Sequence, residues 1–310
     1  MTADSNFIYP LGVSIYSYAV HGPGEVEFDF AVPSDWNKML LESEISAVAD
    51  LVESLGWDFR LVECPINAAV LPRTLHISPM TFVKPAYLDA CDADVVLFLD
   101  ADTIAVDEWK SMRESIKTHA IAAASEDNMR AFELEWGSPE SPPGWYFNAG
   151  MLVADPQRWR NGYLPRWREL LEDYANLGFT LLEQDVMNAA ILGQVDPLPI
   201  EFNVRPAYGH SIKNARVIHY AGYWKPWLSN RALFRSLDPL LQESFDRYAK
   251  AESAFEDFLV THNSGSMLEF WLESKRRTRG RLDIKSYKYF VRGQLGQLKR
   301  TILSAKKGRT

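Results

Sequence analysis

Short apolar runs bounded by turn residues recur along the chain and predict β-strands. The run 95–99 is apolar at every position and rich in β-branched and aromatic residues, which is typical of a strand buried on both faces of a sheet. The other strands that this pattern predicts cover 27–32, 58–62, 120–124, 150–154 and 217–220.

Segments with apolar residues at helical spacing lie between these strands. The clearest covers 40–55, where an amphipathic pattern ends at Gly56. Residues 33–35 predict a turn and a helix cap, and the Pro- and Ser-rich stretch 137–144 predicts a loop. Further helices are predicted around Val13, Ile15 and Tyr18 and over 79–90, 159–175 and 183–192. Strands that alternate with helices predict an α/β fold with a mostly parallel central sheet.

A chain of 310 residues is long enough for one large α/β domain, or for a domain with an appendage. Its two cysteines, Cys64 and Cys91, suggest neither a disulfide framework nor a zinc site, which fits a reducing compartment. No apolar stretch approaches the roughly 18 residues of a spanning helix, and no basic-then-apolar leader opens the chain. We therefore expect a cytoplasmic protein.

The charge is distributed unevenly along the chain. The tail 275–310 holds 13 Lys and Arg residues against one acid, Asp283, so it carries +12 while the whole chain carries −8. Because basic residues alternate there with aromatic and aliphatic ones, we expect the tail to bind an anionic membrane surface. A solvated or disordered tail is the alternative. No RNA-recognition motif accompanies the charge, so no nucleic acid partner is expected.

Two carboxylates follow the apolar run 95–99 directly, Asp100 and Asp102. The ends of such strands are where open α/β sheets place ligands. Two acids this close repel each other unless a cation neutralises them, and hard oxygen donors favour Mg²⁺ or Mn²⁺ over zinc. An ordinary strand that ends in a solvated acidic turn is the alternative.

Further segments, taken with this acidic pair in order and spacing, resemble glycosyltransferase family 8. They are the N-terminal Asp4-Ser5-Asn6-Phe7, then 147–152, 183–188, 198–203 and 219–227. The resemblance covers about 2–227. It implies a Rossmann-like GT-A fold over 1–230, followed by a helical C-terminal region over 231–310 with its basic tail from 275. It also implies a retaining transferase that uses a UDP-sugar and Mn²⁺, with Mg²⁺ as the other candidate.

The resemblance assigns roles to particular residues. It gives the cation to Asp100, Asp102 and His219, and imidazole beside carboxylates suits Mn²⁺ better than Ca²⁺. It gives the nucleotide and its phosphates to Asp4, Asn6, Lys84, Ala101, Gly222 and Lys225. It gives the donor sugar to Asn148, Ala149, Glu183 and one of Glu126 and Asp127. From the residues alone, His219 could be structural, Lys84 a solvated helix lysine, and the acids at 126 and 127 caps or surface groups.

The mechanism depends on Gln184 and Asp185. By resemblance, Gln184 lies nearest the reacting face of the sugar, and an amide is a feeble nucleophile. That favours front-face substitution, in which the departing phosphate takes the acceptor's proton. Attack by Asp185 as a covalent nucleophile is the alternative, because retaining hydrolases use a carboxylate in this way. Glu183 departs from the Asp that is common at its position in the family.

The expected acceptor is a saccharide or lipid-linked saccharide, a surface glycan precursor at the inner face of the membrane, where the enzyme would be peripheral. A self-glucosylating enzyme like glycogenin and a non-catalytic binder of sugar nucleotides are the alternatives. Family members also have a buried strand ahead of the Asp4 segment, where this chain has only Met1 and Thr2. Either the sheet lacks a central strand or the chain starts late, and we expect the latter.

Overall fold

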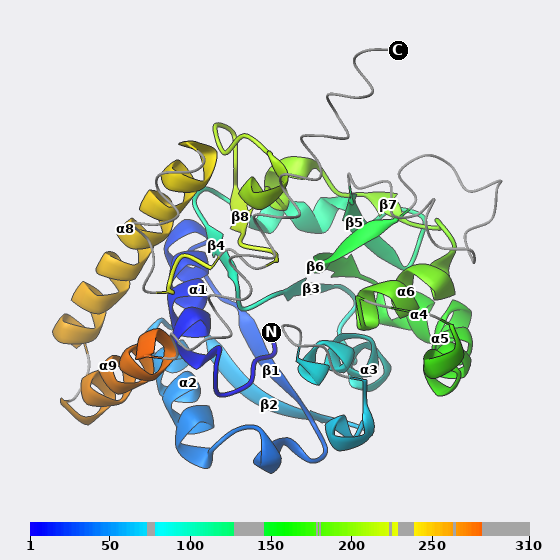
Figure 1. Ribbon diagram of the computed structural model, residues 1–310, viewed down its shortest axis with the longest axis horizontal. Helices are drawn as coiled ribbons and strands as arrows, with labels where there is room; N and C mark the ends of the chain where they lie inside the picture. The colour runs from blue at the N-terminus through cyan, green and yellow to red at the C-terminus, as the bar shows by residue number, and fades with distance from the viewer. Residues whose placement is uncertain are drawn as a thin grey trace.

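The computed structural model describes residues 1–72, 78–126, 146–177, 179, 181–222, 225–228, 239–262 and 265–280 (Figure 1). Its strands are β1 (Glu27–Pro33), β2 (Asp58–Cys64), β3 (Val96–Leu99), β4 (Thr103–Ala105), β5 (Ile121–Ser125), β6 (Phe147–Ala154), β7 (Asp196–Pro197) and β8 (Val217–His219). Its α-helices are α1 (Ile8–His21), α2 (Glu42–Ser54), α3 (Val83–Ala90), α4 (Pro156–Gly162), α5 (Leu164–Glu172), α6 (Glu183–Ile191), α8 (Pro239–His262) and α9 (Gly265–Gly280). Each predicted strand has a counterpart here, and the predicted α/β fold is confirmed.

The local sequence explains where two helix predictions were wrong. The helix expected over 159–175 is two helices, α4 and α5, because Pro165 stands in the first turn of α5 and cannot continue a preceding helix. The cap expected at Asp35 does not form. The Asp35 carboxylate instead accepts from the backbone N–H groups of Ala68 and Ala69, at 2.8 and 3.1 Å. The loop expected at 137–144 lies outside the described residues.

The sheet is mixed rather than mostly parallel. Strands β1 and β2 pair in parallel, as do β5 and β7, but β6 runs antiparallel to both β3 and β5, and β4 runs antiparallel to β8. The reversed direction of β6 brings its first residues beside the end of β3, where the Asp100 N–H donates to the Gly150 carbonyl at 2.9 Å. Polar residues that follow β3 and polar residues at the start of β6 therefore meet at the same end of the sheet.

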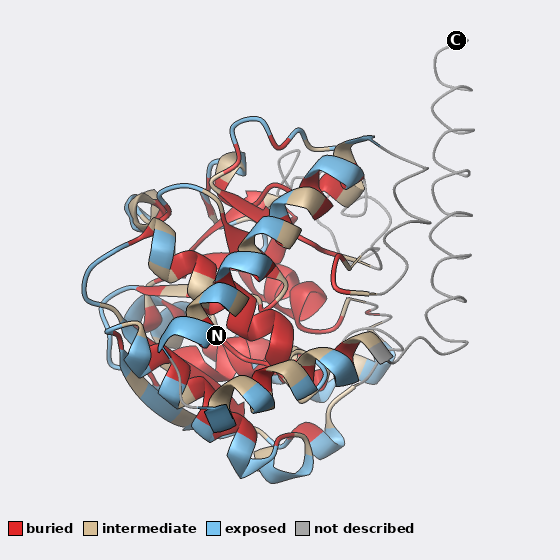
Figure 2. Ribbon diagram, turned by 90° about the vertical axis from the view of Figure 1, so that its left-hand side faces the viewer, coloured by how far each residue is buried: buried red, intermediate tan, exposed pale blue. Residues whose placement is uncertain are grey.

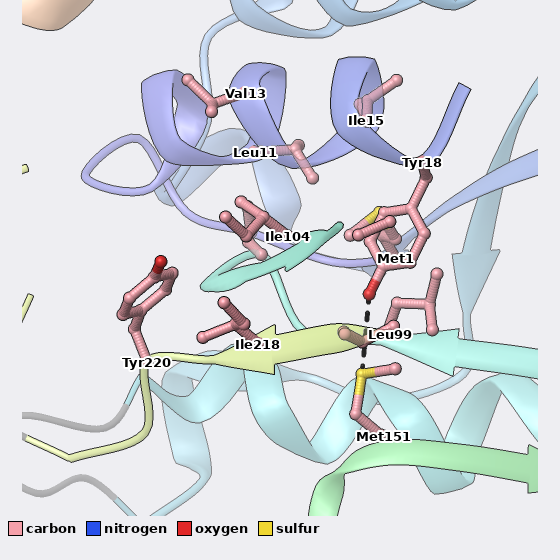
Figure 3. Packing of buried hydrophobic residues seen from close by; sticks show 14 of the residues in the cluster. Met1, Leu11, Val13, Ile15, Tyr18, Leu99, Ile104, Met151, Ile218 and Tyr220 are labelled. Atoms are coloured by element: carbon pink, nitrogen blue, oxygen red, sulfur yellow. Dashed lines mark hydrogen bonds between the residues drawn. The ribbon is translucent and has the colours of Figure 1, made fainter. Parts of the chain in front are cut away.

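Strand β6 also separates the two hydrophobic cores. It is buried at every position, and its side chains alternate between the two sides, as the period of a strand requires. Met151 and Val153 belong to the core beneath α1, whereas Leu152 and Ala154 belong to the core beneath α4, α5 and α6. Figure 3 shows the first core from close by, with α1 above β4 and β8.

The first residues of the chain are buried beside β1. The Met1 carbonyl accepts from the Ala31 N–H at 2.9 Å, and the Met1 ammonium donates to the Asp29 carbonyl at 2.9 Å. Burial lowers the pKa of this ammonium to about 5. Among the described residues, β1 and β2 form one hydrogen-bonded sheet and β3, β6, β5 and β7 another. The chain's N-terminus lies between β1 and β3 in the view of Figure 1.

Helices α8 and α9 turn buried residues toward α1 and exposed residues outward (Figure 2). Trp271 of α9 is fully buried against Gly12 of α1, where an added Cβ would lie 2.6 Å from the indole ring. Basic residues of α9 pair with acids of the same fold: Lys275 with Glu256, Arg277 with Glu44, and Arg279 with Glu252. Among the described residues, no helix combines the length and the apolar character that crossing a membrane requires.

Candidate active site

The sharp connection between β3 and β4 gathers the acidic pair and a distant histidine. Thr103 opens β4, lies opposite His219 of β8, and donates through its hydroxyl to the Asp100 carbonyl at 2.7 Å. The Tyr220 N–H donates to the Asp102 carbonyl at 2.9 Å. One side-chain ligand atom from each of Asp100, Asp102 and His219 lies within 4.8 Å of the other two. The structure thus brings together the three residues expected to bind a cation.

This donor set fits the expected cation. Two carboxylates and one imidazole are oxygen and nitrogen ligands that suit Mn²⁺ and Mg²⁺. Burial raises the pKa of Asp102, but the charges of Lys225 and His219 outweigh it and hold that pKa well below its usual range. Asp102 is therefore a carboxylate at neutral pH, as a metal ligand must be.

The histidine ring lies directly on the backbone of β6. A Cβ added to Gly150 would lie 2.1 Å from the His219 Cε1 atom, far inside van der Waals contact. Only glycine leaves room for the imidazole here, which explains the glycine in the 147–152 segment. Gly150 could not be assigned this role from the sequence, because the clash involves a residue far along the chain.

Lys84 is fully buried and lies between two acids, so the alternative of a solvated lysine is wrong. Its ammonium lies 2.6 Å from Asp100 Oδ1 and 3.2 Å from Glu183 Oε1, and it donates to the Ala149 carbonyl at 2.9 Å. Burial lowers the pKa of Lys84, but the two carboxylates outweigh it, and the pKa ends above its usual value. Burial also raises the pKa of Glu183, which Lys84 offsets in part.

A second lysine contacts the acidic pair at Asp102. Lys225 pairs with the Asp102 carboxylate and donates to the Tyr220 carbonyl at 2.6 Å. The turn before it contains Gly222 at φ +80°, in the left-handed region that favours glycine. The Lys225 ammonium also lies 5.9 Å from the centre of the Phe7 ring. Phe7 directly follows the N-terminal turn of Asp4 and Asn6, in which the Asn6 N–H donates to Asp4 Oδ1 at 2.9 Å.

Two amides at the start of β6 and α6 are joined by hydrogen bonds. Asn148 Nδ2 donates to Gln184 Oε1 at 3.2 Å and to Glu126 Oε2 at 3.1 Å, and the Ala149 N–H donates to Gln184 Oε1 at 3.0 Å. Glu126 is buried rather than a surface acid. Asp127 lies outside the described residues. The expected sugar-binding residues Glu126, Asn148 and Ala149 therefore form one cluster with Gln184, which is expected to be catalytic.

Asp185 is joined to this cluster through Tyr146, whose hydroxyl accepts from Gln184 Nε2 at 3.3 Å. It is fully buried, one carboxylate oxygen accepts from the Tyr146 hydroxyl, and the other accepts from the Leu181 N–H at 2.7 Å. Leu182, which precedes α6, is buried with φ +51° and ψ −123°, a strained conformation for a residue with a side chain. Strain of this kind tends to mark functional sites, and here it lies directly before Glu183, Gln184 and Asp185.

Three residues in contact with the site were not identified from the sequence. Tyr146 contacts Asp185, Asn203 lies between His219 and Asn148, and Arg205 pairs with Glu126 at 2.7 Å and donates to the Ser125 carbonyl at 2.7 Å. Asn203 ends the 198–203 segment, so a signal was present. Arg205 belongs to no segment singled out, and only its complete burial marks it.

Comparisons with known proteins agree with this geometry. The sequence model described as glycosyl transferase family 8 matches residues 1–231. The lipopolysaccharide 1,2-glucosyltransferase of Escherichia coli K12 is 24% identical over 244 residues, which cover 72% of this chain and 70% of that protein. A probable galacturonosyltransferase-like protein of Arabidopsis thaliana is 24% identical over 261 residues, 74% of this chain and 65% of that protein.

A solved structure of the galactosyltransferase LgtC, in complex with donor and acceptor sugar analogues, has a similar fold. It superposes with a TM-score of 0.66 at 22% identity and covers 82% of this chain and 94% of that one. This likeness shows the fold.

Proposed function

Since the chain belongs to glycosyl transferase family 8 and is a hexosyltransferase, we propose that it transfers a hexose from a UDP-sugar to a saccharide acceptor, with retention and with Mn²⁺. The observation that carries the proposal is the order of groups across the site. Acids and an imidazole lie between two lysines, and the amide cluster of Asn148 and Gln184 follows on one side. That order suits a cation, a diphosphate and a sugar in turn.

The chain's own residues supply the positive charge at the phosphate end. Asp100, Asp102 and His219 would hold the cation, which would supply positive charge against the departing nucleotide diphosphate. Lys84 pairs with Asp100 and Lys225 with Asp102, and each can turn from its carboxylate to a phosphate oxygen. Gly222 allows the backbone to approach a phosphate without a Cβ in the way.

The contacts of Gln184 and Asp185, the residues expected beside the donor sugar, support front-face substitution. The Gln184 amide oxygen is held by two donors, Asn148 Nδ2 and the Ala149 N–H, so it is a fixed dipole at the edge of the cluster. Both oxygens of Asp185 are engaged and its side chain is fully buried, which argues against its use as a nucleophile. In this proposal the leaving phosphate takes the acceptor's proton, and Gln184 stabilises the positive charge that develops at the anomeric carbon.

The proposed acceptor is a surface glycan precursor, a saccharide or lipid-linked saccharide. The relative from Escherichia coli is by name a lipopolysaccharide glucosyltransferase, and this proposal extends that kind of acceptor to the present chain. Membrane contact through the basic tail is part of the proposal, and it falls to the residues after 280, because Lys275, Arg277 and Arg279 are already paired with acids.

The test is hydrolysis of UDP-sugars by the full chain without acceptor, over a panel of donors, with and without Mn²⁺. We expect slow Mn²⁺-dependent release of UDP from one donor. Asp102→Asn should abolish it, and the matched control Asp107→Asn, at an exposed acid near the end of β4, should not. A protein that only binds sugar nucleotides would release no UDP from any donor, and a self-glucosylating enzyme would gain the mass of hexoses.

Membrane contact is tested separately by flotation with anionic vesicles. Reversal of two tail charges, Lys299→Glu with Arg300→Glu, should weaken binding. Reversal of the exposed Arg166→Glu on α5 serves as the control and should leave binding unchanged. Equal flotation of all three proteins would refute the tail as the membrane-binding segment.

A further inference from the structure

A series of four hydrogen-bonded side chains connects the sugar-binding cluster to the expected metal ligand His219. Asn148 Nδ2 lies 3.1 Å from Glu126 Oε2, Asn203 Nδ2 lies 2.9 Å from Asn148 Oδ1, and His219 Nδ1 lies 2.9 Å from Asn203 Oδ1. All four residues are buried, and Asn203 is fully buried. The far nitrogen of the ring, His219 Nε2, points to Asp102 at 3.3 Å.

The Glu126 carboxylate, at one end of this hydrogen-bonded series, fixes the direction of every hydrogen bond in the series. A carboxylate only accepts, so Asn148 must turn its NH₂ group to Glu126 and its oxygen to Asn203. The Asn203 NH₂ group must then face that oxygen, which leaves the Asn203 oxygen facing the ring. An oxygen can only accept, and His219 Nδ1 must therefore carry a proton.

Two further contacts support this direction of the hydrogen bonds. The Gly150 N–H donates to Asn148 Oδ1 at 3.1 Å, which requires an oxygen at that position. Arg205, itself fully buried, pairs with Glu126 at 2.7 Å and keeps it in place as a carboxylate. A reversed Asn203 would place its oxygen against the oxygen of Asn148, with no donor between them.

We propose that Asn203 is a positioning residue that holds the proton on His219 Nδ1 and so reserves Nε2 for the cation, with the direction set by Glu126 through Asn148. The inference rests on the proposed function, because it assumes that a cation binds at Asp100, Asp102 and His219. Histidines that bind metals commonly donate their other N–H to a fixed acceptor, and that bond decides which nitrogen binds. Here the acceptor, Asn203, belongs to the hydrogen-bonded series that ends at Glu126 in the sugar-binding cluster. The cation side and the sugar side of the site therefore share one hydrogen-bond direction.

The first measurement is the nitrogen-15 spectrum of the histidine side chains in the metal-free full chain, recorded over a range of pH. We expect His219 to show a protonated Nδ1; the state of Nε2, which faces the Asp102 carboxylate at 3.3 Å, does not enter the test. His21 is an internal reference, because its Nδ1 faces the Ser17 carbonyl at 2.9 Å and must also be protonated. Asn203→Ala should give a mixture of both tautomers at His219 and leave His21 unchanged.

The second measurement is the affinity for Mn²⁺ alone, from the signal of the free ion in electron paramagnetic resonance. Asn203→Ala should weaken binding about 10- to 100-fold, as loss of a ligand's supporting partner does elsewhere. Asn203→Asp keeps an oxygen against Nδ1 but sets its second oxygen against the Asn148 oxygen, so it should hold the Nδ1 proton and weaken Mn²⁺ binding less than Asn203→Ala does. Glu126→Gln replaces the acceptor by an amide that can face either way, so His219 should show both tautomers in that variant as well.

The inference is overturned if wild-type His219 lacks a proton on Nδ1, or if Asn203→Ala changes neither the tautomer nor the Mn²⁺ affinity. The proposed function fails differently: the wild type would then bind Mn²⁺ no better than Asp102→Asn. The tautomer of the metal-free chain still decides the inference in that case. Glu126→Gln and Asn203→Asp keep the test valid even where Asn203→Ala does not fold.

Discussion

Replacing Lys84 by Met removes a buried cation from between two acids and keeps most of the side-chain volume. In the wild type the ammonium contacts Asp100, Glu183 and the Ala149 carbonyl at 2.6, 3.2 and 2.9 Å. Only 5% of the Glu183 side chain is exposed, against 24% for Asp100, so the unpaired charge falls mainly on Glu183. Removing one partner of a buried pair costs about 3–5 kcal/mol in the free energy of unfolding.

The pH dependence of that loss follows from Glu183. Its pKa is already raised by burial, and loss of Lys84 removes the charge that opposes the rise. An acid whose folded-state pKa is raised binds its proton more tightly in the folded chain than in the unfolded one. Lowering the pH from neutral toward the acid range therefore stabilises the variant relative to the wild type, by up to about 1.4 kcal/mol per pH unit for one proton.

The assay is urea denaturation without metal, at pH 7.5 and 5.5. Arg168→Met is the matched control: Arg168 is 57% exposed and pairs with Asp89 at 2.6 Å on the surface, so its loss costs at most about 1 kcal/mol. A Lys84→Met variant no less stable than this control at pH 7.5 would refute the reasoning. So would a loss of stability that grows as the pH falls.

Three further outcomes are expected. Gly150→Ala should weaken Mn²⁺ binding at least about tenfold, since the new methyl group displaces the His219 ring; an unchanged affinity in a titration would contradict that geometry. Gln184→Ala should lower kcat at least about tenfold, or about 1.4 kcal/mol in the barrier, and turnover within about threefold of wild type would exclude its role. Trp271→Ala should cost about 3–5 kcal/mol and lower Tm, because the indole is fully buried on Gly12; an unchanged Tm would mean that α9 does not stabilise the fold.

The strands and the acidic pair could be predicted because their signals are local. The run 95–99 predicts a buried strand, and the two acids directly after it predict a polar strand end, whatever the rest of the chain does. Strand direction is not local. An apolar run has the same pattern in a parallel and an antiparallel strand, so the reversal of β6, which brings Gly150 beside Asp100, could not be anticipated from its sequence.

The contacts of the site were harder to predict than its residues. A lysine at position 84 in a short helix has the same local pattern whether it is solvated or buried, and only Asp100 and Glu183 decide between the two. Arg205 and Glu126 are likewise far apart in sequence and paired in space. Family resemblance could indicate Asn148, His219 and the segment that contains Asn203, but the contacts by which Asn203 joins the other two become visible only from the distances.

The charges of the site explain why a cation and a diphosphate would bind together. Lys84 pairs with both Asp100 and Glu183, and Lys225 pairs with Asp102, so each lysine lies on one of the two acids expected to bind the cation. A lysine that turns to a phosphate leaves its carboxylate without a partner, at the position where a cation would supply one. A cation alone would lie beside both ammonium groups, and a diphosphate alone would compete with the acids. The charged side chains are therefore paired in either of two states. Without ligands the lysines pair with the acids, and with both ligands the lysines pair with the diphosphate while the cation pairs with Asp100 and Asp102.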